Sequence, residues 1–164
     1  MRYWGIRIGV PGDPDQFVLI ARKYGFISIG WNDLKDISRF KNKEELKKHY
    51  ENVYGSSDPS SIKTLWDFAN ELNVGDIVLV PHLDERAERV VYVGRIAGPY
   101  VYFDKWIDIC GHHHRRRTEW VKEIWWDTLS EQLRNTLSTP QTLRNLDDYR
   151  YEIEFQLIQY SRLF

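Results

Sequence analysis

Hydrophobic residues recur at helical spacing most clearly in one stretch of the chain. The apolar positions there are Ile62, Leu65, Trp66, Ala69 and Leu72. This spacing places them on one face of an α-helix. Asp58 can accept hydrogen bonds from the first free backbone amides, and Pro59 suits the first helical position. The pattern therefore predicts a helix over residues 59–72.

Shorter signals predict the other elements. Short runs of apolar and β-branched residues between turn residues predict strands over residues 2–9, 26–31, 77–81, 89–97 and 117–126. Residues 98–103 are expected to turn and start another strand, and alternation over 149–158 predicts an edge strand. Helices are expected over 15–23, 43–53 and 128–137. This order is typical of an α+β domain built on a curved sheet or small barrel.

Composition indicates one globular domain. The 164 residues are 42% hydrophobic and 29% charged, which suits a chain with a substantial core. The formal net charge is -1, so attraction for nucleic acid must come from a local patch. Cys110 is the one cysteine and no secretory signal pattern opens the chain, which indicates a cytoplasmic protein. No apolar run approaches the roughly 20 residues needed to span a bilayer, so no membrane partner is expected.

The segment GHHHRRRTEW combines three histidines with three arginines. In an extended chain Cys110, His112 and His114 would share one face and could hold zinc, but no second cysteine supplies a fourth ligand. A solvated loop is a second interpretation. In the third, guanidinium groups contact phosphate together with His114; these are Arg115, Arg116 and Arg117. We favour phosphate contact, on a par with the solvated loop, and expect no metal.

Motifs of common enzymes are absent from the sequence, including the nucleophile elbow, the phosphate loop and HExxH. Acid pairs such as Asp147 with Asp148 could bind a divalent ion, as a nuclease requires. Glu152 and Glu154 would instead form the wet face of an alternating strand. His49 and His82 are interpreted as surface residues. We therefore expect no catalytic residues and no cofactor, and a metal-dependent nuclease is the less favoured alternative.

The tryptophans divide into two groups. Trp66 lies on the apolar face of the predicted helix, and Trp125 and Trp126 are expected to pack under the sheet. Trp4 and Trp31 each adjoin a glycine, which lets a ligand come close. Asn32 follows Trp31 and can both donate to and accept from a base edge. Such residues could cage a flipped base.

Four segments in order, GFISIGWNDLKDIS, LWDFANELNVGDIVLVP, YVGRIAGPYVY and HRRRTEW, resemble the EVE-like modules of the PUA superfamily. These modules stand at the N-termini of modification-dependent restriction proteins of the McrB type. The resemblance implies a small, strongly curved β-barrel flanked by helices, related to the YTH domains that hold methylated adenine. It also implies that residues 1–164 form one domain, the N-terminal module of a larger protein.

The resemblance further implies a DNA-binding module that flips a methylated base, most simply 6-methyladenine, into an aromatic pocket. Pocket residues carried over are Trp4, Trp31, Asn32, Trp66, Asp67, Tyr100 and Tyr102. Backbone contacts would come from His114, Arg115, Arg116 and Arg117. A nuclease subunit could join through a downstream domain. The superfamily also contains RNA-binding modules, so an RNA-binding PUA-like module is the main alternative.

Overall fold

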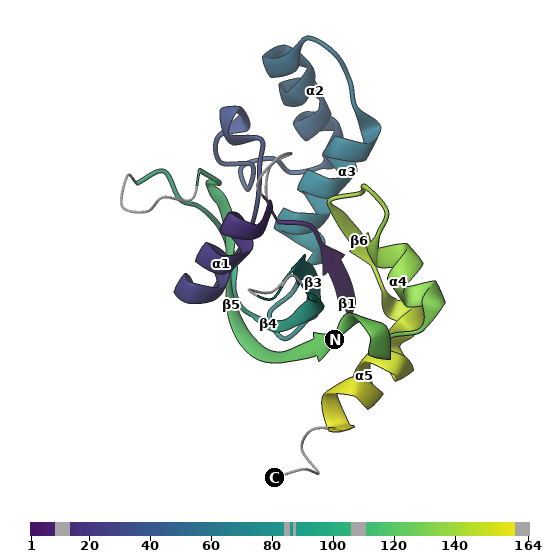
Figure 1. The fold of residues 1–164 in the computed structure, drawn as a ribbon. Helices are drawn as coiled ribbons and strands as arrows, with labels where there is room; N and C mark the ends of the chain where they lie inside the picture. The colour runs from purple at the N-terminus through teal and green to yellow at the C-terminus, as the bar shows by residue number, and fades with distance from the viewer. Residues whose placement is uncertain (9–13, 84–85, 87, 106–110, 160–164) are drawn as a thin grey trace.

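The fold is known from a computed structural model that describes residues 1–8, 14–83, 86, 88–105 and 111–159. It is α+β, with a curled six-stranded sheet that forms a half-barrel and five helices (Figure 1). The strands are β1 (Tyr3–Ile6), β2 (Phe26–Ile29), β3 (Ile77–Leu83), β4 (Arg89–Tyr102), β5 (His114–Trp125) and β6 (Leu143–Asn145). The helices are α1 (Pro14–Tyr24), α2 (Lys43–Tyr54), α3 (Pro59–Trp66), α4 (Glu131–Leu137) and α5 (Arg150–Gln159).

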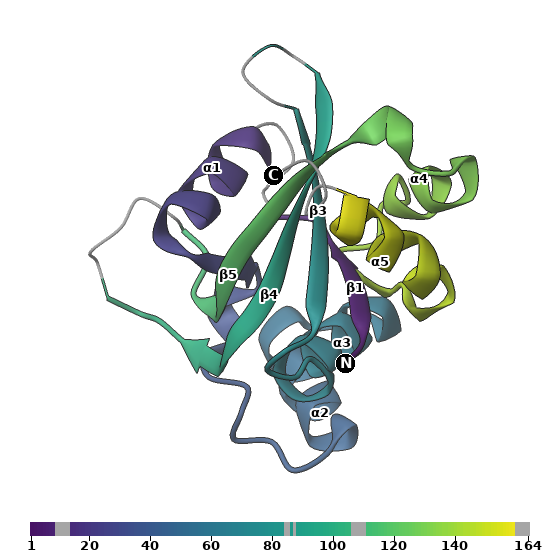
Figure 2. The same cartoon turned by 90° about the horizontal axis from the view of Figure 1, so that it is seen from below.

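The strands lie in the order β2-β5-β4-β3-β1-β6. Neighbours are antiparallel except β1 and β3, which are parallel. The long β4–β5 ladder shifts register between Val93 and Gly94 and again between Ile96 and Tyr100. Such bulges bend and twist a strand pair, which accounts for the strong curl of β5 in Figure 1. Figure 2 shows α1 beside β5 at one side of the sheet and α4 with α5 at the other.

Both faces of the sheet are covered, because alternate residues of β3 and β4 enter two separate apolar clusters. Val78 and Val80 pack into one cluster with residues of α1, α2 and α3. Ile77 and Leu79 pack into the other with residues of α4 and α5. A strand with two covered faces reads as a continuous apolar run, which is why IVLV at the start of β3 is apolar throughout.

The helix predicted over residues 59–72 is confirmed at its start. The Asp58 side chain accepts from the backbone amides of Ser60 and Ser61, and Pro59 opens the helix. Beyond Trp66 the backbone changes to a π-helical segment over Asp67–Glu71. The predicted α1, α2 and α4 are confirmed near their expected bounds, as are the strands around β1, β2 and β3.

Three predictions of secondary structure are wrong. Residues 98–102 continue β4 through a bulge and do not begin a new strand. The histidine–arginine segment is largely part of β5, so it is no solvated loop. The expected edge strand over residues 149–158 is α5, where Ile153 and Gln156 are buried. Its Tyr151, Ile153 and Phe155 alternate along the chain, so the apolar pattern fits period 2 as well as a helix.

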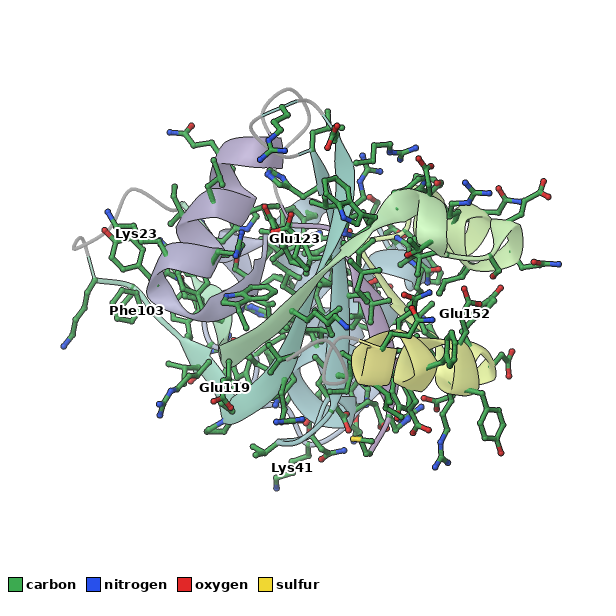
Figure 3. All side chains as sticks on the ribbon, turned by 60° about the horizontal axis from the view of Figure 1, so that its bottom comes forward. Lys23, Lys41, Phe103, Glu119, Glu123 and Glu152 are labelled. Carbon is green, nitrogen blue, oxygen red and sulfur yellow. The ribbon has the colours of Figure 1, made fainter. Side chains whose placement is uncertain are left out.

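Glu152 and Glu154 of α5 make contacts within the protein and do not form the predicted wet face of a strand. Glu152 reaches α4 (Figure 3) and accepts hydrogen bonds from the Ser130 amide at 2.6 Å and the Ser130 hydroxyl at 2.7 Å. Glu154 accepts from the Tyr3 hydroxyl at 2.5 Å. Both carboxylates therefore fix α5 against the rest of the fold. None of the helices in the described residues has the length and apolar character to cross a membrane.

Candidate functional site

Trp31 has an unusual backbone conformation. It lies just after β2 with φ 62° and ψ 41°, in the left-handed region. For a bulky residue this conformation costs on the order of 1–3 kcal/mol and persists only where surrounding contacts impose it. Lys35, four residues later, also has a positive φ of 59°. The short 3-10 turn Asn32–Leu34 therefore lies between two strained residues.

Hydrogen bonds from His114 hold the Trp31 backbone. The Trp31 carbonyl accepts from His114 Nε2 at 2.9 Å and from the Leu34 amide at 3.1 Å. His114 Nδ1 lies 2.7 Å from the Tyr100 hydroxyl. Because Nε2 must donate to a carbonyl, a neutral His114 accepts at Nδ1 and Tyr100 donates. Burial lowers the pKa of His114, which favours this neutral form.

Tyr100 and Tyr102 join this network from β4. The Tyr100 hydroxyl also accepts from the Ile37 amide at 3.2 Å. Tyr102 donates to the Asn32 carbonyl at 3.1 Å, and its hydroxyl lies 3.2 Å from His113 Nδ1. Desolvation by burial raises the pKa of both phenols, so both remain protonated donors at neutral pH.

The carboxamide of Asn32 ties the turn to the start of β5. Its oxygen accepts from the His113 amide at 2.9 Å, and its nitrogen donates to the Gly111 carbonyl. Both polar atoms of the side chain are thus engaged within the protein. Asn32 therefore fixes the turn that follows Trp31, and its assignment as a reader of base edges stays a prediction.

His112 and Arg115 close the network behind this turn. His112 Nδ1 lies 3.1 Å from the Ser28 hydroxyl, and its ring packs 4.8 Å from Phe17. Burial, with the nearby Arg115 charge, lowers the pKa of His112 to about 4. We call this set the aromatic–histidine cluster: Trp31, Asn32, Tyr100, Tyr102, His112, His113 and His114.

Three carboxylates lie near Tyr102 in the cluster. Asp104, Asp33 and Asp36 all raise the pKa of Tyr102 by their charge. Asp33 and Asp104 are exposed. Carboxylates repel phosphate and accept hydrogen bonds from amino groups. The carboxylates near Trp31 therefore suit the amino group of a base edge.

Trp4 does not belong to this cluster. It is 2% exposed and part of the core under the sheet. Its indole nitrogen donates to Asp76 at 3.1 Å, and Asp76 also accepts from the Arg2 and Asn73 amides. Trp4 is therefore a core residue that anchors a turn, which corrects its assignment to the pocket.

The consecutive arginines of β5 have separate positions. Arg116 is 4% exposed and donates to the carbonyls of Phe68, Ala69 and Gly98. Arg115 is 8% exposed, donates to the His112 carbonyl, and lies over the rings of Phe26 and Phe103. His114 is also buried. The burial of these three side chains corrects their assignment as phosphate contacts. Arg117 alone of the four is exposed.

The other predicted residues have different environments. Trp66 is half-buried and packs against the core, as its place on the helix predicts. Asp67 is buried beside Lys63, with which it forms an ion pair. Trp126 is buried as predicted, but Trp125 is 42% exposed, and His82 is buried although it was expected at the surface. His49 is half-buried and contacts the Leu34 carbonyl.

Sequence reasoning missed His112 and His113 as members of the cluster. The run of histidines was the available signal, but it was interpreted through metal binding. Within the described residues, no group of three or more His, Cys, Asp or Glu side chains could hold a metal ion. Cys110, part of the zinc interpretation, lies outside the described residues.

Comparison with known families identifies the family of this chain. Residues 4–147 match the family described as a domain of unknown function, DUF8426. The chain belongs to this family. No curated protein matches its sequence. The DUF8426 range runs from β1 to the turn after β6, so it contains the whole aromatic–histidine cluster and ends before α5.

Proposed function

We propose that this domain is a DNA-binding specificity module that recognises a methylated base, 6-methyladenine, in a modification-dependent restriction system. An extruded base would stack on Trp31, with Tyr102 beside it. The resemblance of four sequence segments to EVE-like modules supports the nucleic-acid ligand and the biological setting. The proposal keeps the Trp31 end of the predicted pocket and omits Trp4.

The left-handed backbone of Trp31 carries the proposal. Strained residues that their surroundings hold in place are concentrated at ligand-binding sites. Here the Trp31 carbonyl is held by His114 and the following turn is held by Asn32. The indole is only half-buried. A rigid, half-exposed aromatic ring loses little conformational entropy when a flat ligand stacks on it.

Energetics and charge are compatible with a methylated adenine. Extrusion costs a few kcal/mol, stacking on an aromatic side chain contributes about 1–3 kcal/mol, and a buried methyl group adds roughly 0.8 kcal/mol. The exocyclic nitrogen of 6-methyladenine keeps one N–H. The exposed Asp33 carboxylate near Tyr102 is of the type that accepts such a donor.

Fluorescence polarisation with labelled duplexes tests the proposal. One duplex sequence carries 6-methyladenine, 5-methylcytosine, 5-hydroxymethylcytosine or no modification, and each is titrated at two salt concentrations. We expect tightest binding to the 6-methyladenine duplex. Trp31→Ala should weaken that binding by about 1–3 kcal/mol, or 5- to 150-fold, and bring it toward the affinity for unmodified DNA.

Trp125→Ala is the matched control, because Trp125 is also a surface tryptophan of this domain but lies at the far end of β5. It should leave the preference for methylated DNA unchanged. Equal affinity of the wild-type protein for all four duplexes would contradict modified-base recognition. Tighter binding to the matched RNA would favour the RNA-binding alternative.

A further inference from the structure

A second surface lies at the other end of the β2–β5 pair. A groove of about 530 Å³ opens between the C-terminal end of α1 and β5. We call it the α1–β5 groove, and its polar and aromatic walls are formed by Arg22, Lys23, Tyr24, Arg117, Glu119 and Trp120. Lys23 lies on the outer side of α1 and Glu119 on β5 (Figure 3).

The walls of the groove are held rigidly together. The Trp120 indole donates to the Ala21 carbonyl at 3.1 Å. Gly25 ends α1 with φ 73°, a conformation that glycine adopts without strain. Its amide donates to Ala21 at 2.9 Å, and its carbonyl accepts from the Thr118 amide at 2.8 Å. The last turn of α1 is thus fixed directly against β5.

A bulge in β4 leaves room around Arg117. The β4–β5 register passes from Ile96 opposite Thr118 to Tyr100 opposite Arg116, so three β4 residues face Arg117 alone. One of them is Gly98, where an added Cβ would lie 3.1 Å from the Arg117 Cβ. Arg117 is exposed, and within the described part of the chain no carboxylate pairs with its guanidinium.

The charge of this groove is mainly positive. Three cations and one carboxylate line it. Arg22 is partly engaged, at 3.9 Å from Glu123 and 3.9 Å from the centre of the Tyr92 ring. Among the described residues, Lys23 contacts the Tyr24 ring alone, at 5.3 Å, so Lys23 and Arg117 are the cations open to a ligand.

We infer that the α1–β5 groove binds the phosphodiester backbone of the DNA that flanks the recognised base. The inference rests on the proposed function and assigns its backbone contacts to exposed residues of this groove. The Arg117 fork matches phosphate oxygens, and Lys23 adds a point charge. Tyr24, 57% exposed, can pack against a sugar. Five residues, 26–30, separate Gly25 of the groove from Trp31, which spans about 20 Å in an extended chain, or roughly six base steps along a duplex.

The test is the salt dependence of binding by the full chain, measured by polarisation with the 6-methyladenine duplex and its unmodified counterpart. Removing two phosphate contacts in Lys23→Ala/Arg117→Ala should reduce the slope of log affinity against log salt by about 1.8. Affinity for both duplexes should fall together, at least about tenfold near 0.1 M salt. The preference for the methylated duplex should persist. Circular dichroism and the thermal midpoint verify that these exposed substitutions leave the fold intact.

Lys41→Ala/Lys48→Ala removes the same charge from exposed positions at α2 and should keep the wild-type slope. The inference would be overturned if the groove variant kept the wild-type slope of log affinity against log salt. It would also be overturned if the α2 variant lost as much of that slope as the groove variant. If the wild-type protein binds both duplexes equally and the groove variant alone loses that binding, the groove stands and modified-base recognition fails. Absence of duplex binding by the wild-type protein would overturn both.

Discussion

In the region around β2 and β5 the buried side chain of Arg116 connects segments far apart in the sequence, whereas in the region around β1 and β6 the buried side chain of Arg144 connects neighbouring ones. Arg116 donates to carbonyls 47, 48 and 18 residues away, joining the π-helical segment to the β4 bulge. Arg144 donates to Thr136, Thr139 and Gln141, all within 8 residues along the chain. Burial lowers the pKa of each guanidinium to about 10.

The difference shows how the two regions are built. At β6, apolar residues of α4 and α5 make the packing, and the arginine closes one local turn. At β5, buried histidines and arginines replace apolar packing on part of the core side, and strain accumulates at Trp31. Polar networks in a low-dielectric interior are stable only when nearly every group is paired. The β5 region should therefore be more sensitive to single substitutions.

The largest expected effect is that of Arg116→Ala. It leaves three carbonyls without their donor in a buried site, so the free energy of unfolding should fall by about 3 kcal/mol or more. Arg144→Ala should cost roughly half as much, because its turn can open locally. Urea unfolding of both variants measures the difference, and equal losses would remove the distinction between the two regions.

The next effect concerns pH. The pKa of His112 is about 4 in the folded protein and near 6.5 when unfolded. The unfolded state therefore binds more protons below pH 6.5, and stability should fall as pH drops from about 6.5 to 4, by on the order of 3 kcal/mol from this group. His112→Gln should be less stable at pH 7 but show a shallower decline. Parallel pH profiles of the two proteins by thermal unfolding would speak against His112 as the cause.

A smaller loss is expected from Gly94→Ala, at the first bulge of the β4–β5 ladder. An added Cβ would lie 2.5 Å from the Thr118 side chain and 3.1 Å from the Trp120 ring. Overpacking of this kind costs about 1–3 kcal/mol. Gly111→Ala is the control, because no described residue other than its chain neighbours has an atom within 4 Å of its added Cβ. Equal thermal midpoints of the two variants would show that the β4–β5 pair shifts at this bulge to accommodate the added methyl group.

The smallest effect should come from α5. Phe155 is 58% exposed on a helix beyond the family match. Phe155→Ser should change the free energy of unfolding by less than about 0.5 kcal/mol. Urea unfolding checks this value, and a loss above 1 kcal/mol would mean that the outer face of α5 contributes to the fold.

The candidate site was predictable only in part. Trp31, Asn32, Tyr100, Tyr102 and His114 were expected near one another, and the fold brings them together. Trp4 and Asp67 were expected to be open to a ligand with them, and both are buried instead. An adjacent glycine marked both Trp4 and Trp31 as pocket candidates. This local pattern could not tell them apart, because it contains no information on which side of a strand is covered. The carboxylates near Tyr102 and the α1–β5 groove depend on contacts between distant segments.

Local signals in the sequence determined the elements whose stability is local. The Asp58–Pro59 start of α3, the apolar β3 and the helices α1, α2 and α4 follow from capping chemistry and period alone. Only the tertiary structure decided that residues 149–158 form a helix and that GPYVY continues β4. It also decided that Arg116 is buried while Arg117 faces solvent. Adjacent side chains on a strand point to opposite faces, and which face is covered depends on what packs there.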